Sequence, residues 1–395
     1  MAKILEKGDT NLHVAVLLYT ASGGLSTYAL ELSEALVRRG LDVTLFGVRQ
    51  CAVNEKFQYM TIPHIEVLKK IRDPLVWNMS IGARVTNILR SSSIDIVHCV
   101  YPALVPFIRL RKPIVCSGWF SPHNLQARLS IAIRMFPFSF SRLGELWGQT
   151  EYFFLDDFGY RSSRSIFAVT KALEENLRGR FGSKVRYLPP GINLISRKRM
   201  TGGQKVRIAC IASDLENPRK GLSTLLRALT LLEPPLYQRI ELLLIGNYSY
   251  RLENEVEMLR QKGFSSIRLS GYVQRERIIE NLLQINLLVC PSLYEEFGYV
   301  VLEAMSAGVP VIATKVRPLT DIILHGVSGL LFEKENIREL SSLISMLIMD
   351  QEIRSKMGEE AQKRAIEEFG WDSIALKLEN YYREILETSQ KKSYL

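Results

Sequence analysis

Two glutamates with seven residues between them, Glu295 and Glu303, are the acidic side chains best placed to bind a ligand rich in hydroxyl groups. A buried strand is expected to end at Pro291 and a helix to begin near 297–299, which puts Glu295 on the turn between them. Glu303 then lies about one turn into the helix among apolar residues, where a carboxylate is costly unless it is hydrogen-bonded, and sugar hydroxyls are suitable donors. The alternative is a capping acid at 295 and a backbone-satisfied carboxylate at 303.

Two adjacent cations, Arg219 and Lys220, follow the first strand of the second half of the chain. Cations at the carboxyl end of a strand suit a pyrophosphate, which charge-assisted hydrogen bonds stabilise. Asp214 and Glu216 precede them, but an oxygen-ligand metal cage usually needs more acids than these. We therefore expect a phosphate site without a metal, and a solvated loop is the alternative.

Gly23 and Gly24 come directly after the first expected strand, residues 13–18. Glycines let a backbone approach a ligand closely, and the N-terminus of the following helix offers free N–H groups to phosphate. The segment is not a G-x-G-x-x-G fingerprint, and no acid follows the second strand at the place that binds ribose. These absences disfavour a dinucleotide oxidoreductase, although any tight turn between strand and helix can use glycines.

Two histidines follow or end expected strands, His123 after residues 113–116 and His98 at the end of 94–98. His123 would lie near the presumed cleft at the carboxyl edge of a parallel sheet, so it is a candidate for a chemical role. A lone histidine is more often structural, and the chain shows no Ser/His/Asp order and no nucleophile elbow.

Short apolar runs alternate with helical periodicity along the chain, which is typical of βαβ units and parallel sheets. The alternation stops around Pro189-Pro190-Gly191 and restarts at Val206, so the linker is placed there. We predict a first domain over 1–190, a second over 191–370, and a final helix over 371–395 that packs back on the first domain. Two such domains would face each other across a cleft at the carboxyl ends of their strands.

The composition is that of an ordinary globular protein of 395 residues, with 47% hydrophobic and 23% charged residues. The five cysteines are far apart and form no C-x-x-C or Cys/His cluster, which argues against a disulfide framework or zinc site and favours a reducing compartment. No window is long and apolar enough for a membrane span, and the start is read as a buried strand in preference to a signal peptide. A cytoplasmic location is expected.

The net charge of +10 belongs almost entirely to the first half. Residues 101–150 carry six basic groups against one acid, Glu145, and also seven Phe or Trp residues. Basic groups interleaved with aromatics suit an anionic membrane surface or a phosphorylated lipid, and also single-stranded nucleic acid. A solvated basic face over a normal core is the alternative.

The run from Glu295 to Thr314 resembles the hallmark of the family 4 retaining glycosyltransferases, which have the GT-B fold. Its two glutamates have the separation that the family motif requires, and 321–332 matches the segment that ordinarily follows. Further matches fall in the family order, including Gly23-Gly24, Pro189-Pro190-Gly191, Lys220-Gly221 and the closing Phe369-Gly370-Trp371. The likeness is strong after residue 160 and thin between about 50 and 160.

The resemblance implies sugar transfer from a nucleotide-activated donor with retention of the anomeric configuration. By this likeness Glu303 binds the ribose hydroxyls, Glu295 holds donor sugar hydroxyls, and Lys220 neutralises the diphosphate with Gly24 opposite. The amides of Phe297, Gly298 and Tyr299 would approach the sugar or phosphate. Cations and helix dipole would then replace a metal ion, and no cofactor beyond the nucleotide-sugar substrate is expected.

Three departures from the family pattern stand out. Leu215 and Asp214 occupy the place of an arginine, for which Arg219 is the substitute we infer. Glu296 replaces a small glycine. Trp119 stands where the family often has a histidine, which leaves His123 as the nearest candidate on the acceptor side.

The function expected from these observations is a metal-independent, retaining glycosyltransferase that acts on a lipid-linked or polysaccharide acceptor. Its partners would be the donor, the acceptor and an anionic membrane surface at the inner face, and no nucleic acid. The alternatives are an epimerase or phosphorylase of the same fold, and a non-catalytic nucleotide-sugar-binding protein.

Overall fold

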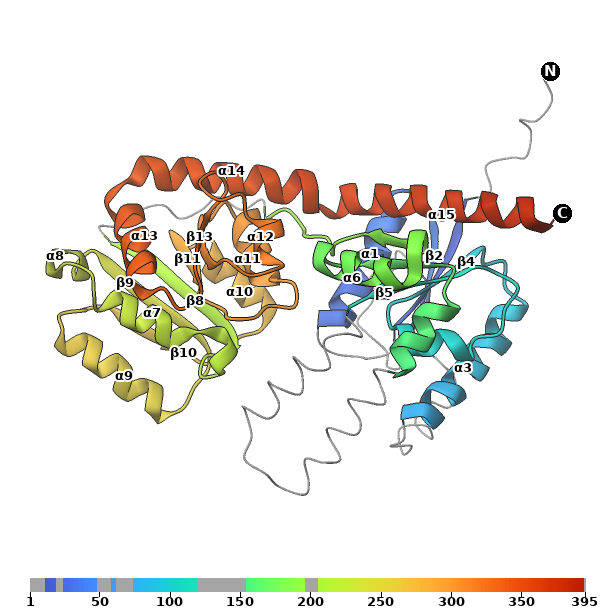
Figure 1. Cartoon of the computed structure of the whole chain (residues 1–395), viewed down its shortest axis with the longest axis horizontal. Helices are drawn as coiled ribbons and strands as arrows, with labels where there is room; N and C mark the ends of the chain where they lie inside the picture. Colours follow the sequence, from blue (N-terminus) through green and yellow to red (C-terminus); the bar gives the residue numbers. More distant parts are fainter. Residues whose placement is uncertain are drawn as a thin grey trace, which may run out of the picture. The chain divides into compact units, whose positions relative to one another are not determined.

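The computed structural model describes residues 11–18, 24–47, 58–61, 74–119, 154–195 and 205–393. The chain divides into two compact units, which are coloured along the sequence in Figure 1. Unit 1 comprises Met1–Gly191 and Trp371–Leu395, and unit 2 comprises Ile192–Gly370. Each unit is built on one sheet of parallel strands. The predicted GT-B class of α/β fold, with a last helix that returns to the first domain, is confirmed.

The sheet of unit 1 has the strand order β3-β2-β1-β4-β5-β6-β7. Successive side chains of β1 point to opposite faces: Val14 and Val16 join one core, and Ala15 and Leu17 join the other. The strands are β1 His13–Leu17, β2 Asp42–Gly47, β3 Gln58–Thr61, β4 Ile96–Cys99, β5 Ile114–Gly118, β6 Ser165–Ala168 and β7 Val185–Tyr187.

Helices cover both faces of this sheet. The first and last helices share one core, and the remaining long helices pack on the other face. The helices are α1 Gly24–Arg38, α3 Pro74–Arg90, η1 Pro102–Phe107, a helix at 154–162, α6 Lys171–Phe181, η3 Gly182–Lys184 and α15 Trp371–Ser393.

The sequence pattern did not predict β3 or α3. The inner face of α3 includes the polar residues Asn78 and Thr86, which are buried, and the Thr86 Oγ1 hydroxyl donates to the Gly82 carbonyl 2.7 Å away. Its outer face exposes Leu75 and Met79. Polar residues inside and apolar residues outside weaken the periodicity by which an amphipathic helix is recognised.

The sheet of unit 2 has the order β10-β9-β8-β11-β12-β13, so the strand order reverses direction at β8. In open parallel sheets a ligand is usually bound beside the strand carboxyl ends at such a reversal, here between β8 and β11. The strands are β8 Val206–Asp214, β9 Ile240–Asn247, β10 Ile267–Ser270, β11 Leu287–Cys290, β12 Val311–Thr314 and β13 Leu330–Phe332.

The helices of unit 2 also form two layers, each with its own core. The helices α7, α9 and α13 lie over one face, and α10, α11 and α14 over the other. Their bounds and those of the shorter helices are η4 Pro218–Lys220, α7 Leu222–Leu229, α8 Pro234–Tyr237, α9 Tyr250–Gln261, α10 Arg275–Leu282, α11 Tyr299–Ser306, α12 Leu319–Ile322, α13 Ile337–Met349 and α14 Gln351–Phe369.

Candidate active site

An ion pair joins the loops that follow β8 and β11, the two strands at the reversal of the unit 2 sheet. The Lys220 Nζ ammonium lies 2.6 Å from Glu295 Oε1, and the Ser292 hydroxyl donates to the same oxygen at 2.8 Å. Both charged side chains are mostly buried, with 25% of Lys220 and 12% of Glu295 exposed. The structure thus brings together the cation and the carboxylate that the sequence placed in separate motifs.

Gly221 allows the two loops to approach each other. Its φ is +65°, and a Cβ on this residue would lie 2.0 Å from the Pro291 carbonyl oxygen. The Leu293 amide donates to the Arg219 carbonyl at 2.7 Å, and the Asn217 side chain accepts from the Arg219 amide at 3.1 Å. Backbone contact therefore holds Lys220 next to the turn that carries the glutamate.

Arg219 points its guanidinium toward an aromatic ring of the β11 loop. The guanidinium carbon lies 5.8 Å from the centre of the Tyr294 ring, and Nε is buried without a hydrogen-bond partner among the described residues. A cation over an aromatic face is held without losing its capacity to donate to an anion. Arg219 is therefore a second cation at the β8 loop.

The acids that precede Arg219 serve the local structure. The Asp214 carboxylate accepts from the Glu216 amide at 3.0 Å, and Glu216 accepts from both the amide and the hydroxyl of Ser249, just before α9. Within the described residues, no group of three or more His, Cys, Asp or Glu side chains is arranged to hold a metal ion.

The first turn of α11 begins at a glycine. Gly298 has a φ of +99°, and a Cβ there would lie 2.6 Å from the Leu319 side chain. Phe297 is buried and meets Tyr299 edge-on, with 5.1 Å between ring centres. No side chain in the described part of the chain caps this first turn, so its backbone N–H groups and positive dipole end suit an anion.

Glu303 is buried on α11, as its apolar neighbours predicted, with only 4% of the residue exposed. Its Oε1 accepts from Arg275 Nε at 2.8 Å, and the guanidinium comes from the start of α10. Sequence reasoning missed Arg275, because nothing in the local spacing connects it with the glutamate motif. The one signal that could have pointed to Arg275 was the need of a buried carboxylate for a cationic partner.

The candidate residues of unit 1 are only partly described. Gly24 begins α1, whereas Gly23 and His123 lie outside the described residues. Trp119 follows β5 and meets Tyr28 edge-on, with 4.8 Å between ring centres. Its indole N–H donates to the Val100 carbonyl at 3.0 Å, so this indole takes part in packing.

His98 belongs to the core. Its Nδ1 lies 2.5 Å from the Tyr382 hydroxyl of α15, and its Nε2 lies 2.8 Å from the Ser117 hydroxyl. Burial lowers the pKa of His98 to about 3, so the ring stays neutral at physiological pH. The structural interpretation of this histidine is the one that the contacts support.

Four cysteines lie within the described residues, and all four are free thiols. Burial raises the pKa of Cys210 to about 12 and that of Cys290 to about 11. Cys290 ends β11, but a thiol with so high a pKa is a poor nucleophile at neutral pH. The thiols of unit 2 are therefore packing groups.

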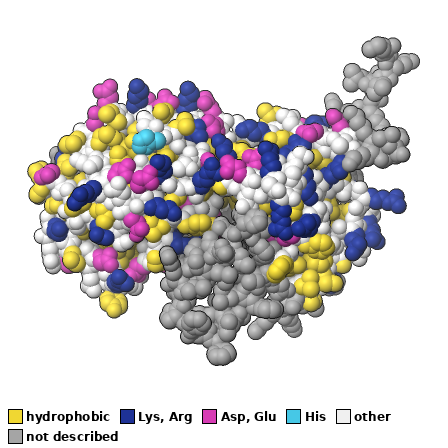
Figure 2. Space-filling view, viewed as in Figure 1, with side chains coloured by type: hydrophobic (Ala, Val, Ile, Leu, Met, Phe, Trp, Pro, Cys, Tyr) yellow, Lys and Arg dark blue, Asp and Glu magenta, His cyan; other side chains and the backbone are white. Residues whose placement is uncertain are grey.

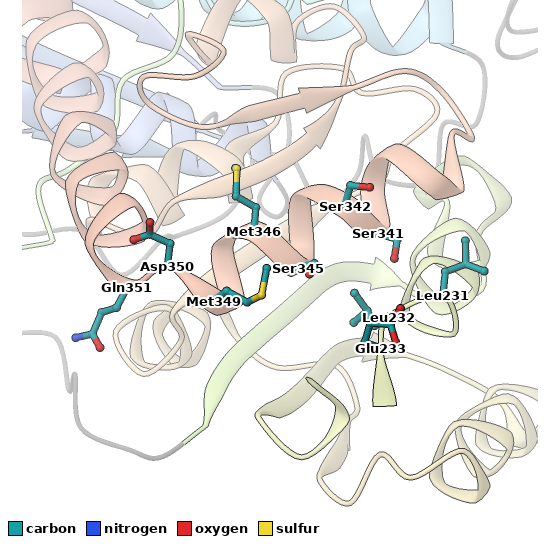
Figure 3. A pocket seen from close by; sticks show the side chains of 10 residues that line it. All are labelled: Leu231, Leu232, Glu233, Ser341, Ser342, Ser345, Met346, Met349, Asp350 and Gln351. Atoms are coloured by element: carbon teal, nitrogen blue, oxygen red, sulfur yellow. The ribbon is translucent and has the colours of Figure 1, made fainter. Parts of the chain in front are cut away.

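A groove of about 710 Å³ lies elsewhere on unit 2, against α13 (Figure 3). Its walls include exposed Leu231 and Met349, and none of the predicted site residues lines it. No helix among the described residues has the length and hydropathy that a bilayer span requires.

Two family models match successive parts of the chain. The model for glycosyl transferases group 1 matches residues 202–364, and the model for glycosyltransferase family 4 matches residues 22–195. A relative described as an uncharacterized glycosyltransferase of Methanocaldococcus jannaschii is 24% identical over 392 residues, covering 92% of this chain and 95% of its own.

Solved structures of similar fold cover nearly all of the chain. The sucrose-phosphate synthase of Thermosynechococcus elongatus matches with a TM-score of 0.70 at 18% identity, over 96% of this chain and all of its own. The HepE protein of Anabaena in complex with UDP-glucose matches with a TM-score of 0.64 at 17% identity, over 96% of this chain and all of its own.

Proposed function

The chain belongs to the group 1 glycosyltransferases of family 4, and on that premise we propose that it transfers a sugar from a nucleoside diphosphate-sugar to a hydroxyl of a lipid-linked or polysaccharide acceptor, with retention. The observation that supports this most directly is the contact between Lys220 and Glu295 beside the carboxyl ends of β8 and β11. A phosphate-binding cation there adjoins a carboxylate able to accept hydrogen bonds from sugar hydroxyls.

In the proposed reaction the donor diphosphate lies between the β8 loop and the start of α11. Lys220 donates one of its three N–H groups to Glu295 and the others to phosphate oxygen atoms. Arg219 and the first-turn amides of α11 add positive charge, so the developing charge on the leaving group is stabilised without a metal ion. Glu295 would orient the sugar and Glu303 the ribose.

The bond changes follow a front-side displacement. The acceptor oxygen attacks the anomeric carbon on the face from which the nucleoside diphosphate leaves. The bond between the anomeric carbon and the phosphate oxygen breaks, and the acceptor proton passes to the departing phosphate. Attack and departure on one face preserve the anomeric configuration, which the anomer of the isolated product would reveal.

The acceptor side of the proposal is assigned to unit 1. The Gly23-Gly24 turn would face the diphosphate, and His123 is proposed as the acceptor-side residue. The excess of basic groups in the first half suits an acceptor at an anionic membrane surface, and the proposed location is the cytoplasm at the inner face of the membrane.

Substitution of Lys220 tests the proposal. We expect Lys220→Ala to lower transfer from the preferred donor by roughly 100-fold or more, because one charge-stabilising donor is lost where negative charge develops. The donor would first be chosen by thermal shift with UDP-glucose and GDP-mannose, since a ligand bound only to the folded state raises the unfolding temperature.

The control is Arg227→Ala, which removes an exposed cation of neighbouring α7. This variant should keep full activity and unfold at the wild-type temperature. Lys220→Ala should remain folded at the assay temperature but unfold at a lower temperature, because it removes the cation from the mostly buried Glu295 carboxylate. Sugar transfer that continues at the wild-type rate in Lys220→Ala would refute the proposed site. Donor hydrolysis without acceptor, measured alongside, separates an enzyme from a protein that only binds nucleotide-sugars.

A further inference from the structure

A second groove, of about 1110 Å³, lies in unit 1 at the amino-terminal ends of β5 and β6. This is the sheet edge opposite to the one where Trp119 and the start of α1 lie, because all the strands are parallel. Its walls are the end of α3, the segment around 105–114 and residues 162–164. It is therefore separate from the carboxyl edge that the proposed reaction uses.

The charged groups of this groove all have one sign. Its thirteen lining residues, every one of them described, include five cations and no acid; the cations are Arg90, Arg109, Arg111, Lys112 and Arg164. Within the described part of the chain none of the five forms an ion pair. Cations gathered without acids create a positive potential that attracts anions.

Local hydrogen bonds fix the segment that carries three of these cations. The Arg109 amide donates to Thr86 Oγ1 at 3.0 Å, and Lys112 Nζ donates to the Ser92 carbonyl at 2.5 Å. The Arg109 and Arg111 side chains remain exposed to solvent, as does Arg90 at the end of α3. The groove thus presents guanidinium groups from a segment that is itself held in place.

Apolar residues separate the cations, and this mixture favours an amphiphilic ligand over a purely ionic one. Six lining residues are apolar: Val105, Pro106, Ile108, Leu110, Pro113 and Ile114. Free phosphate or nucleic-acid backbone would use the cations alone. A phospholipid headgroup places a phosphate on guanidinium groups and apolar atoms beside them.

The two helices that end at the groove carry exposed apolar side chains on their outer faces. In the helix at 154–162, Phe154 and Phe158 are 69% and 51% exposed, and Ser162 on the same face lines the groove. In α3, exposed Met79 lies eleven residues, about three turns, before Arg90. Figure 2 shows hydrophobic side chains at the lower edge of unit 1 and basic ones on its right flank.

We propose that this groove binds the phosphate-bearing headgroups of anionic phospholipids and docks the protein on a membrane, with Phe154 and Phe158 entering the interfacial region. The inference rests on the proposed function, in which the acceptor lies at a membrane, and it names the surface that makes the contact.

The test is sedimentation of the full chain with vesicles, without donor or acceptor. Vesicles of phosphatidylcholine are compared with vesicles that also contain phosphatidylglycerol, at low and high salt. The variant Arg90→Gln/Arg109→Gln/Arg111→Gln should lower the partition coefficient on anionic vesicles by roughly 100-fold, since each juxtamembrane cation contributes severalfold. The variant Phe154→Ser/Phe158→Ser should weaken binding but keep its dependence on salt.

A matched control removes three exposed cations from unit 2, in Lys334→Gln/Arg338→Gln/Lys356→Gln. Binding in this variant should stay within about twofold of wild type. Equal losses in both triple variants would show that net charge alone matters and would overturn the proposal. Vesicle binding that does not depend on the content of anionic lipid would overturn the proposal too. It would also be overturned if the protein bound a single-stranded oligonucleotide in place of vesicles and Arg90→Gln/Arg109→Gln/Arg111→Gln weakened that binding.

Donor hydrolysis, measured on the same protein preparations after donor is added, separates this inference from the proposed function. The groove variant should hydrolyse donor in solution at the wild-type rate, because none of its three residues belongs to the proposed active site. Loss of vesicle binding with hydrolysis intact supports the docking site. If the wild type neither hydrolyses donor nor transfers sugar to an added acceptor but still binds vesicles, the proposed enzyme is refuted and the docking site remains supported.

Discussion

Each motif glutamate is paired with a cation from a distant part of the chain. Lys220 lies 75 residues before Glu295, and Arg275 lies 28 residues before Glu303. Burial in a low-dielectric environment makes an unpaired carboxylate expensive, so these pairs offset the cost of placing both acids in the site. The cations belong to the site as much as the acids do.

Replacement of Arg275 by glutamine tests the second pair. Arg275→Gln replaces the guanidinium that contacts Glu303, whose side chain is only 5% exposed, with a neutral amide, and we expect the free energy of unfolding to fall by about 1–3 kcal/mol. Urea unfolding measures this change. The donor should also bind more weakly, because the carboxylate is no longer held in one orientation.

The control for this prediction is Arg277→Gln, an exposed residue of the same helix, which should change stability by less than about 0.5 kcal/mol. The double variant Arg275→Gln/Glu303→Gln should recover part of the lost stability, because no buried charge remains. If the double variant were no more stable than Arg275→Gln, loss of the pair between Arg275 and Glu303 would not be the cause of the lower stability.

At the scale of elements, the active site depends on how closely two loops of adjacent strands approach. The β8 and β11 strands are hydrogen-bonded neighbours, so their following loops start at the same sheet edge. The η4 turn then brings Lys220 toward the β11 loop, and Gly221 contacts Pro291 at a distance that no other residue permits. The geometry of two turns therefore sets the distance between cation and carboxylate.

Substitution of Gly221 by alanine should disturb both stability and activity. The left-handed backbone alone costs a non-glycine residue about 1–3 kcal/mol, and the contact with Pro291 forces the loop to move. We expect a lower unfolding temperature together with weaker transfer, because Lys220 shifts away from Glu295.

The comparison is Gly179→Ala in the interior of α6, where a Cβ would meet nothing within 4 Å. This change should leave activity intact and stabilise the helix by up to about 1 kcal/mol. Calorimetry compares the unfolding temperatures of the two variants. If Gly221→Ala had wild-type stability and activity, the close approach of Gly221 to Pro291 would not be required.

At the scale of the whole molecule, the chain leaves unit 1 at Gly191 and re-enters it at Trp371. A Cβ on Gly191 would lie 2.2 Å from the Trp371 ring, so the exit and the re-entry are packed together within unit 1. The Trp371 indole donates to Glu31 at 3.0 Å, and buried Tyr382 bonds to His98 in the sheet. The last helix is thus part of the core of the first domain.

This buried network predicts a pH dependence of unit 1. Burial lowers the pKa of His98 from 6.5 to about 3, so between these values the unfolded chain binds a proton that the folded chain does not. The free energy of unfolding should therefore fall as the pH falls from 6.5 toward 3, with a limiting slope of about 1.4 kcal/mol per pH unit from this group. Above pH 6.5 the contribution is constant.

The variant His98→Gln should show a shallower slope between pH 6 and 4 in urea unfolding. Ser117→Ala is its control, because this change breaks the network but keeps the titrating ring, so stability drops while the slope remains. Equal slopes in wild type and His98→Gln would mean that other groups account for the acid sensitivity.

Features that repeat over a few residues are encoded locally in the amino-acid sequence. The alternation of apolar runs with helical periodicity predicted parallel sheets. The segment from Pro291 to Met305 predicted the turn, the start of α11 and the burial of Glu303. Both predictions succeeded because burial periodicity and helix capping are local properties of the sequence.

Contacts between distant segments could not be predicted in this way, because they depend on strand order and on the shape of each turn. Three features of this kind are the pairing of Arg275 with Glu303, the need for glycine at 221, and the groove formed by Arg90 with residues 105–114 and 162–164. Each arises only where the fold brings together segments at an edge of its own sheet. No spacing along a single segment encodes such contacts, since the chain that joins the partners has no preferred length.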